Sequence, residues 1–165
     1  MDLPKLVVRN LRATAVEIPM RYVLGTSATA VRAAPLMLVD LETEEGVTGR
    51  TYLFCYLRAA APAIVTLIDE VARLSRGERV DPPALWATLA KRFTLIGVQG
   101  IVRMAMAGLD IACWDALAIA SGQPLATMLG GAPGKVPAYN SNGLGLMPTS
   151  ALADEAEKLL EGDGV

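Results

Sequence analysis

The feature that most constrains the fold is an apolar stretch that begins at Ile101 and runs to Gly122, with two aspartates inside it. Bulky apolar residues surround most of the helix that this stretch predicts, and Ala105, Gly108 and Ala112 recur at helical spacing. Such a helix must be buried, and its small residues allow another backbone to approach closely. Gly122 predicts the end of the helix, because glycine readily adopts the positive φ of a helix C-terminus.

The two aspartates of this stretch, Asp110 and Asp115, have a structural and a catalytic interpretation. Most aspartates in apolar surroundings are paired or cap another group. Their residue type alone does not decide between these interpretations.

The composition excludes several classes of protein. With 165 residues, 53% of them hydrophobic and 19% charged, the chain can bury a substantial core. A net charge of −2, from 15 basic and 17 acidic residues, argues against binding to nucleic acid or to a membrane surface. No signal peptide and no apolar run of roughly 20 residues is evident, so we expect a cytoplasmic protein. The chain has no histidine, and its two cysteines, Cys55 and Cys113, do not imply a disulfide.

The N-terminal part of the chain predicts a small antiparallel sheet. Partial alternation from Leu6 to Ile18 indicates one strand. Two further β-rich runs, Pro35 to Glu42 and Val47 to Phe54, flank the polar turn at residues 43–46 and predict a hairpin. We expect Met20 to Ala34, which is without clear periodicity, to be a loop.

Helices follow the predicted sheet. Residues 59–75 repeat apolar side chains at helical spacing, and Asp81 before Pro82 predicts the N-cap of a second helix. With the helix from Ile101, the middle of the chain should pack on one face of the sheet. The predicted fold class is α+β.

A composition shift after Gly131 indicates a new unit. A short strand at Val136 to Tyr139, a polar loop from Asn140 to Pro148, and a helix from Ala151 to about Leu160 capped by Ser150 would form one βα unit.

The stretch IVRMAMAGLDIACWDALAIASGQPLATMLGG resembles the "A-G-I-D-x-A-x-W-D … G-x-P-L-x-x-L-L-G-G" block of the enolase superfamily, in its mandelate racemase and muconate-lactonizing branch. LRATAVEIPM and APLMLVDLETEEGVTGRTYLF also resemble the first strand and the hairpin of that family. The resemblance implies an N-terminal capping domain over residues 1–133, a three-stranded antiparallel meander followed by a helical bundle. Residues 134–165 would be the first βα unit of a truncated (β/α)8 barrel, which needs eight strands when complete.

The resemblance implies a reaction but not its catalytic residues in this chain. Members of the family abstract the proton α to a carboxylate, as racemases or acid-sugar dehydratases, and Mg²⁺ holds the charge of the intermediate. The family's K-x-K lysines, metal carboxylates and histidine are not identifiable here, since the four lysines include no K-x-K pair. We therefore predict no catalytic residue and no metal ligand, expect the chain alone to be inactive, and assign Asp110 and Asp115 to structure.

The resemblance also implies where a substrate would be contacted. In the family, the segment that matches Arg21 to Arg32 closes over the barrel mouth, which makes Leu24 and Val31 candidates for apolar contact, together with Tyr56. Ser141 would make a polar contact to the substrate carboxylate. The alternative interpretations are an ordinary surface loop, a packing tyrosine and a turn-forming serine.

A complete enzyme would bind Mg²⁺ and a small carboxylate, a 2-hydroxy acid or an acid sugar, and we expect a homo-oligomer. The alternatives are a non-catalytic α+β binding or assembly module, or one half of a split enzyme. Racemase, dehydratase and cycloisomerase are not distinguished by the sequence.

Overall fold

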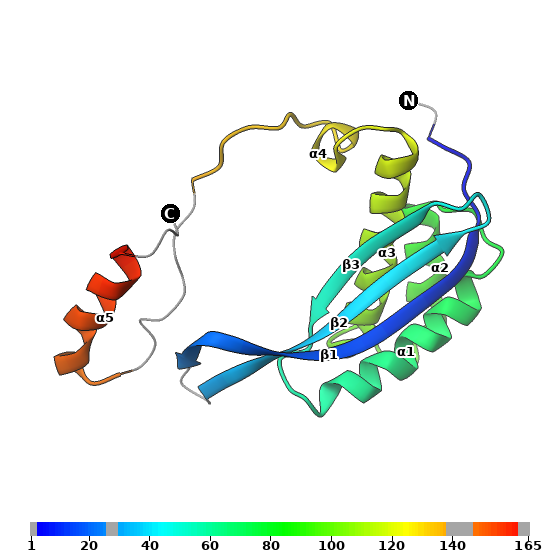
Figure 1. The fold of residues 1–165 in the computed structure, drawn as a ribbon. Helices are drawn as coiled ribbons and strands as arrows, with labels where there is room; N and C mark the ends of the chain where they lie inside the picture. Colours follow the sequence, from blue (N-terminus) through cyan, green and yellow to red (C-terminus); the bar gives the residue numbers. More distant parts are fainter. Residues whose placement is uncertain (1–2, 26–29, 138–146, 162–165) are drawn as a thin grey trace. The chain divides into compact units, whose positions relative to one another are not determined.

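The computed structural model describes residues 3–25, 30–137 and 147–161 (Figure 1). Within these ranges, three strands precede five helices. They are β1 (Val8–Gly25), β2 (Ala30–Thr43), β3 (Thr48–Phe54), α1 (Ala60–Ser75), α2 (Pro82–Arg92), α3 (Ile101–Ala120), α4 (Leu125–Met128) and α5 (Thr149–Glu161).

The chain divides into two compact units. The core unit holds residues 1–16 and 35–133, and the arm unit holds residues 17–34 and 134–165. The outer part of the β1–β2 hairpin, residues 17–25 and 30–34, is called the arm below.

The core unit is a three-stranded sheet, in the order β1-β2-β3, with helices on one face (Figure 1). β2 and β3 pair antiparallel, from Leu36 opposite Phe54 to Glu42 opposite Thr48. Alternation along β2 buries Met37, Val39 and Leu41 in one core with α1, α2 and α3. The α+β prediction, with a meander followed by helices, is confirmed.

The backbones of α3 and β3 approach each other closely at Gly49. A Cβ atom at position 49 would overlap the carbonyl oxygen of Ala112 and lie 2.8 Å from the backbone nitrogen of Ala116. Only glycine therefore fits the strand at this point. As their spacing predicts, the small residues of α3 allow the backbone of β3 to approach the helix closely.

The predicted helix boundaries are largely confirmed. The carboxylate of Asp81 accepts a hydrogen bond from the Ala84 backbone N–H at 3.2 Å, and Pro82 opens α2. Gly122, just after α3, has a φ of 63°. α5 begins at Thr149, so Ser150 lies within its first turn and is not the N-cap that we predicted. No helix in the described ranges is both long and apolar enough to cross a membrane.

The predicted loop at Met20 to Ala34 is wrong. β1 continues to Gly25 and β2 begins at Ala30, so the described residues of this segment extend the hairpin. Most arm residues are exposed or half-buried. A two-stranded ribbon with solvent on both faces needs no alternation of apolar and polar residues. Periodicity therefore could not indicate these strand extensions.

The predicted strand at Val136 to Tyr139 is only partly covered by the structure. Val136 and Pro137 lie outside any strand, and Val136 is exposed. A strand needs a neighbour that accepts its backbone hydrogen bonds, and Val136 and Pro137 have no such partner among the described residues. Residues 138 and 139 are outside the described ranges.

Substitution of Gly49 by alanine tests the contact between α3 and β3. Alanine is normally tolerated in a strand at least as well as glycine, but here its methyl group must displace the α3 backbone. We expect G49A to lower the free energy of unfolding by about 3 kcal/mol or more, measured by urea denaturation.

Gly134→Ala is the matched control, because a Cβ at Gly134 has no heavy atom within 4 Å. We expect it to stay within about 0.5 kcal/mol of the wild-type chain. Equal stability of G49A and G134A would contradict the close approach.

Candidate functional site

Tyr56 is presented in an unusual backbone conformation directly after β3. Among the described residues, it is the one non-glycine residue with positive φ, at 60°. The N–H of Leu57 donates to the carbonyl oxygen of Cys55 at 2.6 Å, which closes a three-residue turn around Tyr56. Residues with side chains are strained in this conformation, and such strain is found preferentially at functional sites.

The turn exposes the ring of Tyr56, which is 71% accessible. The ring of Phe54 contacts it edge-on, with 4.8 Å between the ring centroids. Cys55, between the two aromatic residues, points into the core, and burial raises the pKa of its thiol. Tyr56 can therefore offer an aromatic surface to a ligand, while its neighbour anchors the turn.

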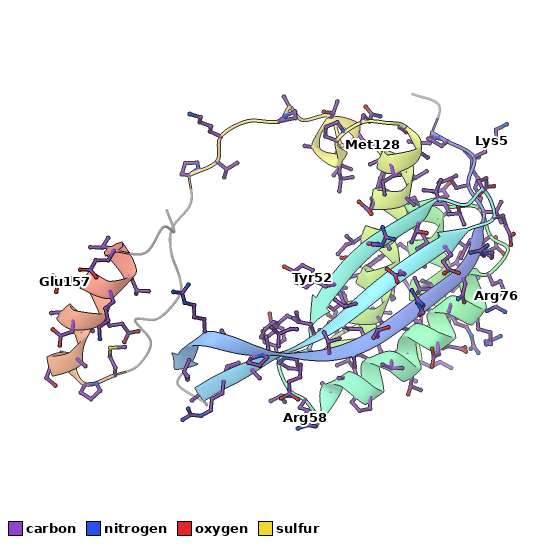
Figure 2. The ribbon with its side chains drawn as sticks, in the orientation of Figure 1. Lys5, Tyr52, Arg58, Arg76, Met128 and Glu157 are labelled. Atoms are coloured by element: carbon purple, nitrogen blue, oxygen red, sulfur yellow. The ribbon has the colours of Figure 1, made fainter. Side chains whose placement is uncertain are left out.

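The outer face of the sheet continues this aromatic surface. Tyr52, opposite Leu38, is 64% exposed (Figure 2), and Phe54 lies opposite Leu36. We call Leu36, Leu38, Tyr52, Phe54 and Tyr56 the outer patch. The sequence prediction included only Tyr56 of this group. The alternation of β2 and β3 could have indicated the other four, because residues facing away from the buried positions share the second face.

Ion pairs occupy the other end of the same face. Arg12 donates to Asp40 at 2.7 Å, Arg50 lies 3.5 Å from Asp40, and Arg9 pairs with Glu42 at 3.2 Å. All three arginines are more than half exposed, so each pair adds little stability. The outer face is thus apolar toward the arm end of β2 and charged toward its other end.

The other predicted contact residues belong to a different unit from Tyr56 or lie outside the described residues. Val31 is half-buried in β2, and Leu24 lies in β1, where only its backbone is described; both belong to the arm unit. Tyr56 belongs to the core unit. Ser141 lies outside the described residues. The roles of these four residues in substrate binding stay predictions.

A cavity of about 450 Å³ lies within the arm unit. It is open to solvent and mixes charged with apolar side chains. The arm contributes Arg21 and Val23 to its lining, and α5 contributes Asp154, Glu155, Lys158 and Leu159. With two cations and two carboxylates, it has no dominant charge that would select a carboxylate ligand.

The described ranges hold no group of three or more histidine, cysteine, aspartate or glutamate side chains that could bind a metal ion. Mg²⁺ prefers oxygen ligands such as carboxylates. A cluster of three or more such residues is not found in the described ranges.

Asp115 ties α3 to the edge of the sheet. Its Oδ2 accepts a hydrogen bond from the Arg50 backbone N–H at 2.8 Å, and β3, which contains Arg50, is an edge strand. A carboxylate that satisfies a backbone donor has a structural role.

Asp110 has a different environment on the same helix. Burial raises its pKa above the ordinary value of 3.8. Burial and the neighbouring charge of Asp110 raise the pKa of Cys113 to about 12, so this thiol is inert at neutral pH.

The fold and the sequence motif in α3 together indicate which family the chain belongs to. The sequence profile described as "Mandelate racemase / muconate lactonizing enzyme, N-terminal domain" matches residues 8–130. This chain therefore belongs to the mandelate racemase and muconate lactonizing enzyme family of the enolase superfamily.

Solved structures of relatives cover nearly the whole chain. An enolase from the alpha proteobacterium BAL199, solved with bound magnesium, is 38% identical with a TM-score of 0.90, over 96% of this chain and 44% of the other. An enolase from Bradyrhizobium, solved with magnesium and mandelic acid, is 36% identical with a TM-score of 0.84, over 95% of this chain and 42% of the other.

A curated relative is more distant. Arabinonate dehydratase from Saccharolobus solfataricus is 25% identical over 125 residues, which are 74% of this chain and 33% of that protein. The chain thus spans less than half the length of each of these three relatives.

Substitution of the two α3 aspartates by asparagine should affect the stability of the protein differently. D115N weakens the hydrogen bond to Arg50 and should cost about 1 kcal/mol at pH 7. D110N removes a charge that burial disfavours, so it should not destabilise the protein at pH 7.

The pH dependence follows from the raised pKa of Asp110. Between the unfolded value, near 3.8, and the folded value, the native state binds more protons than the unfolded state, so its stability falls as pH rises. The stability of D110N relative to wild type should therefore be greater at pH 7 than at pH 3, as measured by thermal unfolding. A constant difference would contradict the desolvation of Asp110.

Proposed function

We propose that this chain is the N-terminal capping part of an enzyme that abstracts the proton α to the carboxylate of a small acid, as a racemase or an acid-sugar dehydratase. The observation that carries the proposal is the match of residues 8–130 to the N-terminal domain of the family. We further propose that residues 1–133 form the cap and residues 134–165 the first βα unit of the barrel. A cytoplasmic location and a homo-oligomeric state belong to the same proposal.

The ligands of relatives support a small carboxylate as the substrate. The structure from Bradyrhizobium holds magnesium and mandelic acid, and the relative from Saccharolobus solfataricus acts on arabinonate. Both acids are 2-hydroxy carboxylates. We propose the same substrate class for the complete protein.

The chemical step requires groups that the described residues do not supply. A proton α to a carboxylate is too weakly acidic for a side-chain base unless a metal stabilises the developing charge. The chain has no histidine and no K-x-K pair, and its described residues hold no metal-binding cluster. We propose that Mg²⁺ and the base belong to the rest of a longer protein, and that this chain contributes substrate contacts only.

The candidate residues have two roles in this proposal. The ring of Tyr56 and the side chains of Leu24 and Val31 would exclude water from an apolar part of the substrate. The hydroxyl of Ser141 would donate a hydrogen bond to its carboxylate. The strained, exposed position of Tyr56 is the structural observation that favours its role.

The isolated chain should not catalyse proton exchange. We expect the α-proton signal of mandelate in D₂O, with Mg²⁺ present, to decay no faster with the chain than with buffer, as measured by proton NMR. Exchange that the chain accelerates and EDTA abolishes would contradict the assignment of the chemistry to other residues.

A chimera tests whether the chain acts as a cap. The chain would replace the matching N-terminal part of the Bradyrhizobium relative, and mandelate binding would be measured by calorimetry with Mg²⁺. We expect the chimera to bind mandelate, and Tyr56→Ala to weaken binding about tenfold, which corresponds to about 1.4 kcal/mol.

Tyr52→Ala is the matched control in the chimera, because Tyr52 is similarly exposed but lies in regular strand conformation. It should change the Kd less than twofold. A folded chimera that fails to bind mandelate would contradict the capping proposal, and equal effects of the two substitutions would contradict only the role of Tyr56.

A further inference from the structure

The arm lacks the support that the rest of the sheet receives. The register of β2 with β3 ends at Leu36 opposite Phe54, so the arm, which lies beyond Pro35, has no third strand among the described residues. An isolated two-stranded ribbon is at best marginally stable in water. The arm therefore needs a further contact if it is to hold a defined position.

The helix α5 has one buried side chain, and that residue lines the same cavity as the arm. Leu159 is 8% exposed, whereas its neighbour Leu160 is 82% exposed. Leu159 shares the cavity lining with Val23 and Arg21 of the arm. The one buried side chain of α5 therefore lies at the cavity that the arm also lines.

Charges of both signs surround this apolar contact. The arm contributes the guanidinium of Arg21, and α5 contributes the carboxylates of Asp154 and Glu155 and the ammonium of Lys158 to the same lining. Neither Arg21 nor Glu155 lacks an interaction partner. Charges at such an exposed position add little stability, so apolar burial supplies most of it.

We propose that α5 anchors the arm through Leu159 and thereby positions the residues at the outer end of the hairpin. Leu159 is thus a positioning residue, since it acts on Leu24 and Val31 through the arm. The consequence for substrate contact rests on the proposed function, whereas the anchoring itself does not.

Hydrogen exchange of the 165-residue chain tests the anchor without any substrate. Replacing Leu159 by aspartate places a charge in the contact, and we expect amides at positions 17–25 and 30–34 to exchange at least about tenfold faster. Amides of β3 and α3 should keep their wild-type rates, which would show that the core unit remains folded. Leu159→Met should restore slow exchange in the arm.

Leu160→Asp is the matched control, because it places the same charge one residue along α5 on an exposed side chain. Its arm amides should exchange at wild-type rates. Unchanged exchange in L159D, or equal acceleration in L159D and L160D, would overturn the proposal. If L159D also accelerates exchange of the β3 and α3 amides, the milder substitution Leu159→Ala is tested by the same criteria.

The result is separable from the proposed function. Mandelate binding by the chimera depends on the cap, whereas arm exchange in the isolated chain depends only on the contact with α5. Faster exchange in L159D together with failed mandelate binding would support the anchor and reject the function.

Discussion

The core unit depends on the contact between the backbones of α3 and β3. Gly49 leaves no space for a side chain beneath Ala112 and Ala116, so the helix lies directly on the strand. This proximity brings Asp115 within hydrogen-bonding distance of the Arg50 N–H. α1 and α2 in turn pack against α3. The other elements of the core unit are arranged around this contact.

The sequence predicted the parts of the fold that burial determines. The small residues of α3 and the alternation of β2 reflect contact with a core, and such contact leaves a periodic pattern. Asp81 was predictable for a different reason, because its capping hydrogen bond is local in the sequence. The arm leaves no such pattern, because its strands are held by backbone pairing rather than by a buried face. The positive φ of Tyr56 was also unpredictable, since glycine or asparagine is the usual residue there.

The candidate site shows the same division between what the sequence indicates and what it does not. Family resemblance suggested Leu24, Val31, Tyr56 and Ser141 as candidates, whereas the residues that would position them can be found only from the packing. Leu159 and Leu160 are identical in type and adjacent in sequence, yet only one is buried. Helical periodicity restricts which side of α5 can be apolar, but it does not identify the partner that covers that side.

The hydrogen bond between Asp115 and Arg50 has a consequence for assembly. An edge strand with free backbone donors is a template for strands of other molecules, and proteins commonly block such edges. Here a carboxylate from the central helix already occupies a donor of β3, close to the helix backbone. A foreign strand could pair at this point only by displacing Asp115. The helix that organises the interior therefore also limits growth of the sheet by intermolecular strand addition.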